Sequence, residues 1–459
     1  MRARIIDRWD AARASYWFVP TIMALGAVAA AALSLDLDRR VGPDALRTVF
    51  TGSAEGARSV LSVIATAMIT VAGVTFAIAL AAMTLASSQF GPRLLRNFMR
   101  DLGNQFVLGT FLATFVFSLL VLGAIRGPDE GAPFVPEVSF NIAVIATLAS
   151  TMVLIYFIHH AATMIQVAHI VSSATADLVR DVDRLFPPAA PDAAPHDPWQ
   201  PAGPGAPALA TEVGYVEVID LDGLARTAEH RDIVIRLVGH PGSFVVTGDV
   251  LAEVWPAERA NEQARRSVAG HFIMGPQRTE QQDVGFTLQQ LVQVALRALS
   301  PAINDPFTAA MCVDRLGAVL SRIVVRPVPP AERLVRGRVR IIAPPPTFEH
   351  LVDSAFGEIR RNGRSQLGLT IRLLLTLEGV ARRAVRAEDR ALIAAEARLV
   401  MDGFATDTLL PDERRRLEVA HRSCIAASSG PDRPGVSPAA DPAGDPAPAD
   451  ASTADGDAG

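Results

Sequence analysis

The sequence predicts a mainly α membrane protein: a four-helix transmembrane domain, then a small β-rich, barrel-like module and a cytosolic helical domain. Three observations support this fold class. Mean hydropathy is +0.27, which is high for a soluble chain of 459 residues. Four apolar stretches without a charged residue lie between residues 17 and 158. Runs of β-branched residues separated by glycine follow, and amphipathic helical patterns come after them.

The four apolar stretches cover residues 17–35, 60–86, 106–125 and 138–158. Each has roughly the 20 residues that a helix needs to cross a hydrocarbon core of about 30 Å. Trp17 and Tyr156 lie near span ends, where interfacial aromatic residues gather. The first stretch is longer than the apolar core of a signal peptide, and three more spans follow it, so we interpret it as a signal anchor.

Arginines in the short flanks predict the orientation, because basic loops stay in the cytoplasm. They are frequent before the first span and between the second and third spans, whereas Arg126 alone lies between the third and fourth. The first loop also contains arginines, but acidic residues accompany them. We therefore expect a multi-pass protein of the bacterial inner membrane with both termini in the cytoplasm.

The domain boundaries follow from composition. We expect a transmembrane domain over residues 1–186, whose fourth helix projects from the membrane until Pro187 and Pro188 end it. Residues 187–211 are rich in Pro and Ala and are expected to form a linker. The β module is placed at 212–256, with strands at 215–219, 233–238, 243–246 and 250–255.

A helical domain is expected over residues 257–428, followed by a disordered tail at 429–459 that is rich in Pro, Ala, Asp and Gly. The helical patterns cover residues 284–299, 306–323, 347–361, 365–385, 388–401 and 412–427. Asp305 is expected to cap the second of these helices, with Pro306 at its first position.

The second span carries the most informative pattern. At 100° per residue, small and hydroxyl side chains share one stripe about 100° wide, with Val63 and Leu80 intruding at its edges. A stripe of this kind either lines a hydrated path or packs closely against another helix, and packing is the commoner of the two. Its members are Ser62, Thr66, Thr70, Gly73, Ala77, Ala81, Thr84 and Ser88.

This span is followed by a break at Gly91-Pro92 and then by an amphipathic segment at 93–102. Its polar side carries Arg93, Arg96 and Arg100, which suits the surface of an anionic leaflet. The layout is similar to that of the pore helix in small-conductance mechanosensitive channels, without a shared motif. An interfacial anchor helix is the favoured interpretation.

A second group of polar residues lies in the expected helical domain and consists of Arg278, Asp283, Arg297, Asn304 and Asp305. These side chains could converge on a small ligand at a helix start. The favoured alternative is a structural network of ion pairs and caps.

Several function classes lack their motifs. The chain has no phosphate loop, no paired-histidine zinc motif and no serine nucleophile elbow, so we expect no enzyme, no metal and no cofactor. His159, His160 and His169 diverge around a helix and cannot form one site within it. Cys312 and Cys424 support neither a disulfide framework nor a zinc site. A net charge of −5 gives no indication of nucleic-acid binding.

Two resemblances to known families remain. The string PGSFVVTGDVL at 241–251 is similar to half of a small biotinyl/lipoyl-type β-barrel, but the chain has no lysine to carry a cofactor. The string SSQFGPRLLRNF at 87–98 resembles the signature of DUF2254, a domain-of-unknown-function family of bacterial predicted membrane proteins. That family's pattern has Ser at the position of Gly91.

Further matches to this family are IYFIHH at 155–160, GYV at 214–216, RT and QD at 278–279 and 282–283, and ALSP and NDP at 298–301 and 304–306. The resemblance covers roughly residues 1–425. It implies a bacterial membrane protein and this topology, and it implies no activity.

Two functional hypotheses stay open. The first is an oligomeric channel or transport-type protein, with the second span facing a central path and a cytosolic regulatory domain. The alternative is a membrane-anchored sensor or interaction module, which binds a small ligand or partner through its cytosolic half. The expected partners are the lipid bilayer and further copies of the chain in a homo-oligomer, and an ion or small molecule of unidentified chemistry.

Overall fold

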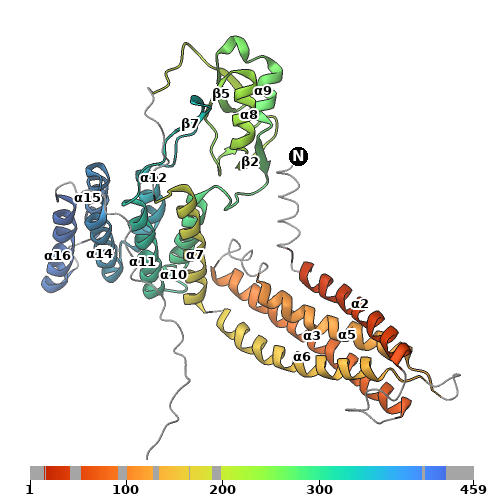
Figure 1. The fold of residues 1–459 in the computed structure, drawn as a ribbon. Coiled ribbons are helices and arrows are strands. Elements are labelled where there is room, and N and C mark those ends of the chain that lie inside the picture. The colour runs from red at the N-terminus through yellow and green to blue at the C-terminus, as the bar shows by residue number, and fades with distance from the viewer. Residues whose placement is uncertain are drawn as a thin grey trace, which may run out of the picture. The chain divides into compact units, whose positions relative to one another are not determined.

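The structure is a computed structural model that describes residues 15, 17–41, 53–90, 101–127, 134–164, 166–188, 198–405 and 409–430. The chain divides into two compact units. The first contains residues 1–177 and 286–312, and the second contains residues 178–285 and 313–459. The first unit therefore holds the membrane helices, and the second holds the strands (Figure 1).

Four long apolar helices confirm the predicted spans. They are α2 (Phe18–Val41), α3 (Ala54–Phe90), α5 (Leu102–Ala124) and α6 (Glu137–Met164), and all four are long and apolar enough to cross a membrane. At 1.5 Å per residue α3 is about 55 Å long, well beyond a hydrocarbon core of about 30 Å. Its ends therefore extend past the apolar stretch that the sequence marks as a span.

Helix α5 lies at the centre of this bundle and contacts α2, α3 and α6 (Figure 1). Leu61, Phe117 and Phe140 belong to one buried cluster, and Met68, Phe111 and Phe157 belong to a second. A Cβ atom at Gly109 would lie 2.4 Å from Sδ of Met23, so glycine lets α2 approach α5 closely. The bundle core is thus built around one face of each outer helix.

Polar side chains form hydrogen bonds with the backbone at two helix ends in the bundle. The carboxylate of Asp38, near the end of α2, accepts hydrogen bonds from the backbone N–H groups of Val138 and Ser139 at 2.8 and 3.0 Å. Asp38 thereby caps the start of α6 from another helix. Arg58 of α3 donates to the carbonyl of Ile125 at 2.8 Å, at the end of α5.

The projecting fourth helix expected from the sequence is two helices. Helix α6 ends at Met164 and α7 (Val167–Leu185) begins after it. The reason lies in the change of pattern: α6 is apolar on all sides, whereas α7 buries one stripe that includes Ile170, Ala174, Leu178 and Val182. The two helices therefore differ in which sides they bury.

The strands of the second unit form two sheets. The larger has the order β1-β5-β3-β8-β7 and the smaller has the order β4-β2-β6. Strands β3 and β8 pair in parallel, and all other neighbours are antiparallel. The bounds are β1 Ala206–Leu209, β2 Gly214–Ile219, β3 Val234–Leu237, β4 Phe244–Val245, β5 Val250–Trp255, β6 Phe272–Gly275, β7 Glu332–Val335 and β8 Arg338–Ile342.

Two helices, α8 (Leu221–Arg231) and α9 (Glu262–Ala269), accompany these sheets. Leu224 of α8 and Val268 of α9 join Ile235, Leu251 and Val254 of the strands in one buried core. The string similar to half of a lipoyl-type barrel contains β4 and the start of β5, which lie in different sheets.

The sheets recruit segments that the sequence pattern assigned elsewhere. Strand β1 lies in the expected linker, and its Pro207 is tolerated because β1 is an edge strand. Strands β6, β7 and β8 lie in the expected helical domain. The β7–β8 hairpin turns through Arg336 and Gly337, both with positive φ, in place of the usual Asn-Gly pair.

The remaining helices lie close to their predicted positions. They are α10 (Val284–Ala298), α11 (Pro306–Ile323), α12 (Phe348–Val352), α13 (Glu358–Gly363), α14 (Leu367–Arg383), α15 (Ala387–Asp402) and α16 (Pro411–Ser428). A π-helical turn at Asp353–Gly357 joins α12 to α13. Helices α14, α15 and α16 pack on one another. Residues 431–459 of the expected tail and 189–197 of the expected linker lie outside the described residues.

Candidate functional site

The small and polar stripe of the second span lies on the outer surface of α3. Every member from Ser62 to Thr84 is exposed, and the side chain of Ser88 lies outside the described residues. The hydroxyl of Thr70 donates to the carbonyl of Thr66 at 2.7 Å, and the hydroxyl of Thr84 donates to that of Leu80 at 2.8 Å. The hydroxyls of Thr70 and Thr84 thus bond within their own helix.

The opposite face of α3 packs into the bundle. Leu61, Ile64, Met68, Ala72 and Ala79 are buried, and α3 contacts α5 and α6. At 100° per residue, the centre of this buried face lies roughly 180° from the centre of the stripe. The stripe is therefore not used to pack α3 against the described helices of its own chain.

The arginines expected at the membrane surface, Arg93, Arg96 and Arg100, lie outside the described residues. Asp101, which follows these residues, has a carboxylate that accepts a hydrogen bond from the N–H of Asn104 at 2.8 Å. Asp101 is thus the N-cap of α5.

Asp101 also joins α5 to α6. Its Oδ1 atom lies 3.1 Å from Nε2 of His160, and the imidazole of His160 stacks on Tyr156 with ring centroids 5.3 Å apart. A Cβ atom at Gly103 would lie 2.9 Å from both the Asp101 carboxylate and the His160 imidazole. We call Asp101, Gly103, Tyr156 and His160 the clasp. His159, the neighbour of His160, is exposed.

The clasp is a site that sequence reasoning missed. Asp101 stands 59 residues before His160, and neither residue has a motif that names the other. Two signals existed: an Asp directly before a span is a cap candidate, and the string IYFIHH placed Tyr156 and His160 one turn apart. Their meeting depends on α5 packing against α6.

The predicted polar cluster divides between the two units. In the second unit, Arg278 donates to Oδ2 of Asp283 from Nε at 2.9 Å and from a terminal nitrogen at 2.6 Å. Asp283 is buried, whereas the side chain of Arg278 keeps 25% of its surface exposed. Gln282, between them, bonds both the N–H and the carbonyl of Ile219, and so fixes this segment against β2.

In the first unit, Asp305 caps α11 as the sequence predicted. Its carboxylate accepts hydrogen bonds from the N–H of Thr308 at 3.1 Å and from the Thr308 hydroxyl at 2.5 Å. These bonds, the hydroxyl first, lower the pKa of Asp305. Asn304 adopts a positive φ of 49°, which Asn tolerates better than most residues, and Arg297 is exposed at the end of α10.

The two cysteines are buried. Cys312 lies in α11 and Cys424 lies in α16, and neither forms a disulfide. Burial is the main cause that raises the pKa of each thiol to about 12. Among the residues that the structure describes, no three His, Cys, Asp or Glu side chains gather closely enough to hold a metal ion.

Comparison with known proteins gives one family and a set of relatives. The profile of a family described as a predicted membrane protein (DUF2254) matches residues 13–379. An uncharacterised protein of Mycobacterium bovis is 32% identical over 435 residues, which cover 93% of this chain and 82% of the relative. An uncharacterised protein of Mycobacterium tuberculosis has the same identity and coverage. No solved structure matches the chain.

Proposed function

This chain belongs to the DUF2254 family of predicted membrane proteins, and on that premise we propose that it forms a homo-oligomeric channel or transport-type protein. In the proposed assembly α3 faces a shared path, and the second unit is a cytosolic regulatory part. We place the assembly in the bacterial inner membrane with both termini in the cytoplasm, from the distribution of arginines in the short loops.

The observation that carries the proposal is the exposed stripe on α3. Ser62, Thr66, Thr70 and Gly73 lie on the face opposite to the one that packs on α5. A lipid-facing surface gains nothing from small side chains, because hydrocarbon offers them no close packing. Against α3 of another copy, small side chains let the two backbones approach closely, and in a hydrated path they leave room for water.

Flux measurements test the path. The purified protein is reconstituted in liposomes, and ion currents are recorded across a range of voltages and membrane tensions. The proposal predicts currents that depend on the protein. Silent bilayers over the whole range would contradict it.

A cysteine scan locates the path on α3, because the two native thiols are buried. Two neighbouring pairs give matched depth: Thr70→Cys with Ile69→Cys, and Ala77→Cys with Ile78→Cys. Thr70 and Ala77 belong to the stripe, whereas Ile69 and Ile78 are exposed beside it. A charged thiol reagent in water should react with the stripe cysteines and block the current, and should react at least about tenfold more slowly with their neighbours, since thiolates form poorly in hydrocarbon.

The same scan separates a path from simple packing between copies. Disulfides between stripe cysteines of two copies, without current and without reaction from water, would mean that α3 only holds an oligomer together. Equal reaction at stripe and neighbouring positions would remove the special role of the stripe.

A second candidate is a membrane-anchored sensor that binds a small ligand through its cytosolic half. It is supported by Arg278, which stays partly exposed beside buried Asp283. Nε2 of His350 and a terminal nitrogen of Arg278 both lie about 4 Å from where a Cβ atom of Gly285 would stand. Thermal shifts with a panel of small anions test it, with Arg278→Gln expected to abolish any shift that Arg297→Gln preserves. No shift with any anion would count against it.

A further inference from the structure

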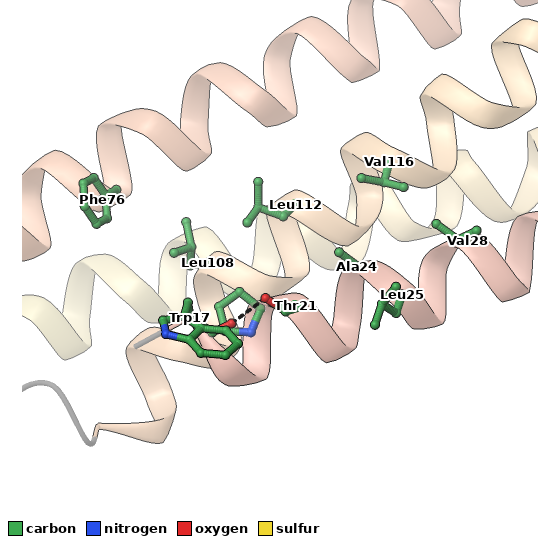
Figure 2. A pocket seen from close by; sticks show the side chains of 10 residues that line it. Trp17, Thr21, Ala24, Leu25, Val28, Phe76, Leu108, Leu112 and Val116 are labelled. Carbon is green, nitrogen blue, oxygen red and sulfur yellow. Dashed lines mark hydrogen bonds between the residues drawn. The ribbon is translucent and has the colours of Figure 1, made fainter. Parts of the chain in front are cut away.

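An apolar groove runs along the membrane bundle between α2 and α5. Trp17, Ala24 and Val28 line one side, Leu108 and Leu112 of α5 line the floor, and Phe76 of α3 closes the far side (Figure 2). The volume of the groove is about 420 Å³. Its α2 side extends from Trp17 to Val28, a length of about 16 Å at 1.5 Å per residue.

The chemistry of the lining is that of hydrocarbon. Thr21 is the one hydroxyl residue in the described lining, and its hydroxyl donates to the carbonyl of Trp17 at 2.8 Å (Figure 2). No charged side chain lines the groove among the described residues. A polar ligand would therefore lose its hydration here without gaining partners.

The dimensions select the kind of occupant. A helix about 10 Å across occupies roughly 1,200 Å³ over this length, so its side chains could enter the groove but its backbone could not. A single extended hydrocarbon chain about 4 Å across fills roughly 200 Å³ over the same length, which the groove can accommodate. The groove length also matches half of a hydrocarbon core of about 30 Å, which is the depth of one leaflet.

The groove is continuous with the surface that α2 presents to lipid. Trp17 is 61% exposed at one end, and Leu25, Val28 and Phe76 are exposed along the opening. Tryptophan is favoured at the level of the lipid headgroups, with its ring against the apolar core. We propose that the groove between α2 and α5 binds one acyl chain of a membrane phospholipid, whose headgroup lies at Trp17 in the leaflet from which α2 enters.

Photocrosslinking tests this inference on the intact protein. It is reconstituted in vesicles of phosphatidylethanolamine and phosphatidylglycerol that contain a trace of phosphatidylglycerol with a diazirine in its acyl chain. After illumination, adducts are mapped by mass spectrometry. We expect residues 17–28 and 108–116 to carry roughly tenfold more adduct than Ile145 and Leu148, which are exposed on α6 outside the groove.

A pair of variants separates the groove from the general lipid surface. Ala24→Trp fills the groove and is expected to abolish the adducts there, whereas Leu33→Trp, on an exposed position of the same helix, is expected to preserve them. Uniform labelling of all exposed apolar residues in the wild-type protein overturns the inference, whether or not the variants fold. Absence of lipid adducts at residues 17–28 and 108–116 of the wild-type protein overturns it as well.

The inference is independent of the proposed function. If the reconstituted protein passes no current, the channel proposal fails, but the prediction of lipid adducts in the groove still stands. If the lipid adducts are uniform, the groove inference fails, but the predicted current through the α3 path still stands.

Discussion

Gly242 is a single residue that is constrained because its backbone approaches a charged pair. Gly242 has a φ of 86°, and a Cβ atom there would lie 2.0 Å from Oδ2 of Asp283 and 3.0 Å from Nε of Arg278. Both the backbone conformation and the contact require glycine. Gly248 offers a comparison, because its φ is 98° but nothing lies within 4 Å of its Cβ position.

Gly242→Ala should therefore destabilise the second unit more than Gly248→Ala. The positive φ costs an alanine about 1 kcal/mol at either position. At Gly242 the added methyl must also displace the buried Asp283 carboxylate, which brings the expected loss to about 2–4 kcal/mol. Chemical unfolding of both variants, followed by circular dichroism, measures the difference. Equal losses would mean that the Arg278–Asp283 pair moves aside freely.

At the scale of elements, helix ends in the bundle are closed by side chains from other helices. Asp38 of α2 caps α6, and Arg58 of α3 reaches the end of α5. The clasp differs, because Asp101 caps its own helix α5 and joins it to α6 through His160. Because unpaired backbone groups are costly in lipid, these contacts tie the register of neighbouring helices to the positions of a few polar residues.

A double-mutant cycle with Asp101→Asn and His160→Gln measures the clasp. We expect a coupling of about 1 kcal/mol, because both side chains keep a fifth or more of their surface exposed and solvent screens the pair. The thermal unfolding of the protein in detergent provides the free energies. In the matched control, His159→Gln replaces the exposed neighbour and should show no coupling to Asp101→Asn. Additive effects of the first pair would mean that the clasp contributes nothing beyond the α5 cap.

At the scale of the whole molecule, each compact unit contains one buried thiol. Cys312 belongs to the first unit and Cys424 to the second. Both side chains are fully buried, and the pKa of each is about 12 against an ordinary 9.0. The thiolate that reacts with alkylating reagents is therefore both hidden and scarce near neutral pH.

Iodoacetamide should leave both thiols of the native protein unmodified and react with each only when its unit opens. Mass spectrometry during stepwise addition of denaturant then shows which unit opens first. Unfolded thiols ionise from about pH 9 while the native thiols stay protonated to about pH 12. The unfolded state then binds fewer protons, so stability should fall as pH rises through this window. Rapid modification of either thiol in the native protein would contradict its burial.

Much of this fold can be predicted from local patterns in the sequence. The spans follow from the length of their apolar stretches, and the helices from Val284 onward follow from 3.6-residue periodicity. The Asp305 cap follows from the string Asn-Asp-Pro, in which Asp precedes a Pro at the first helical position. These patterns act over one helix and need no partner. The break between α6 and α7 was missed, because hydropathy shows where a helix can form and not where its buried side changes direction.

What only the tertiary structure decided concerns pairs of residues that are far apart in the chain. Strand β8 joins β3 over a separation of about a hundred residues, and Asp101 meets His160 over 59. Such partners are chosen by packing, which no local pattern encodes. The stripe on α3 illustrates both levels: periodicity alone placed its members on one face, and the burial of the opposite face against α5 decided that this face points away from its own bundle.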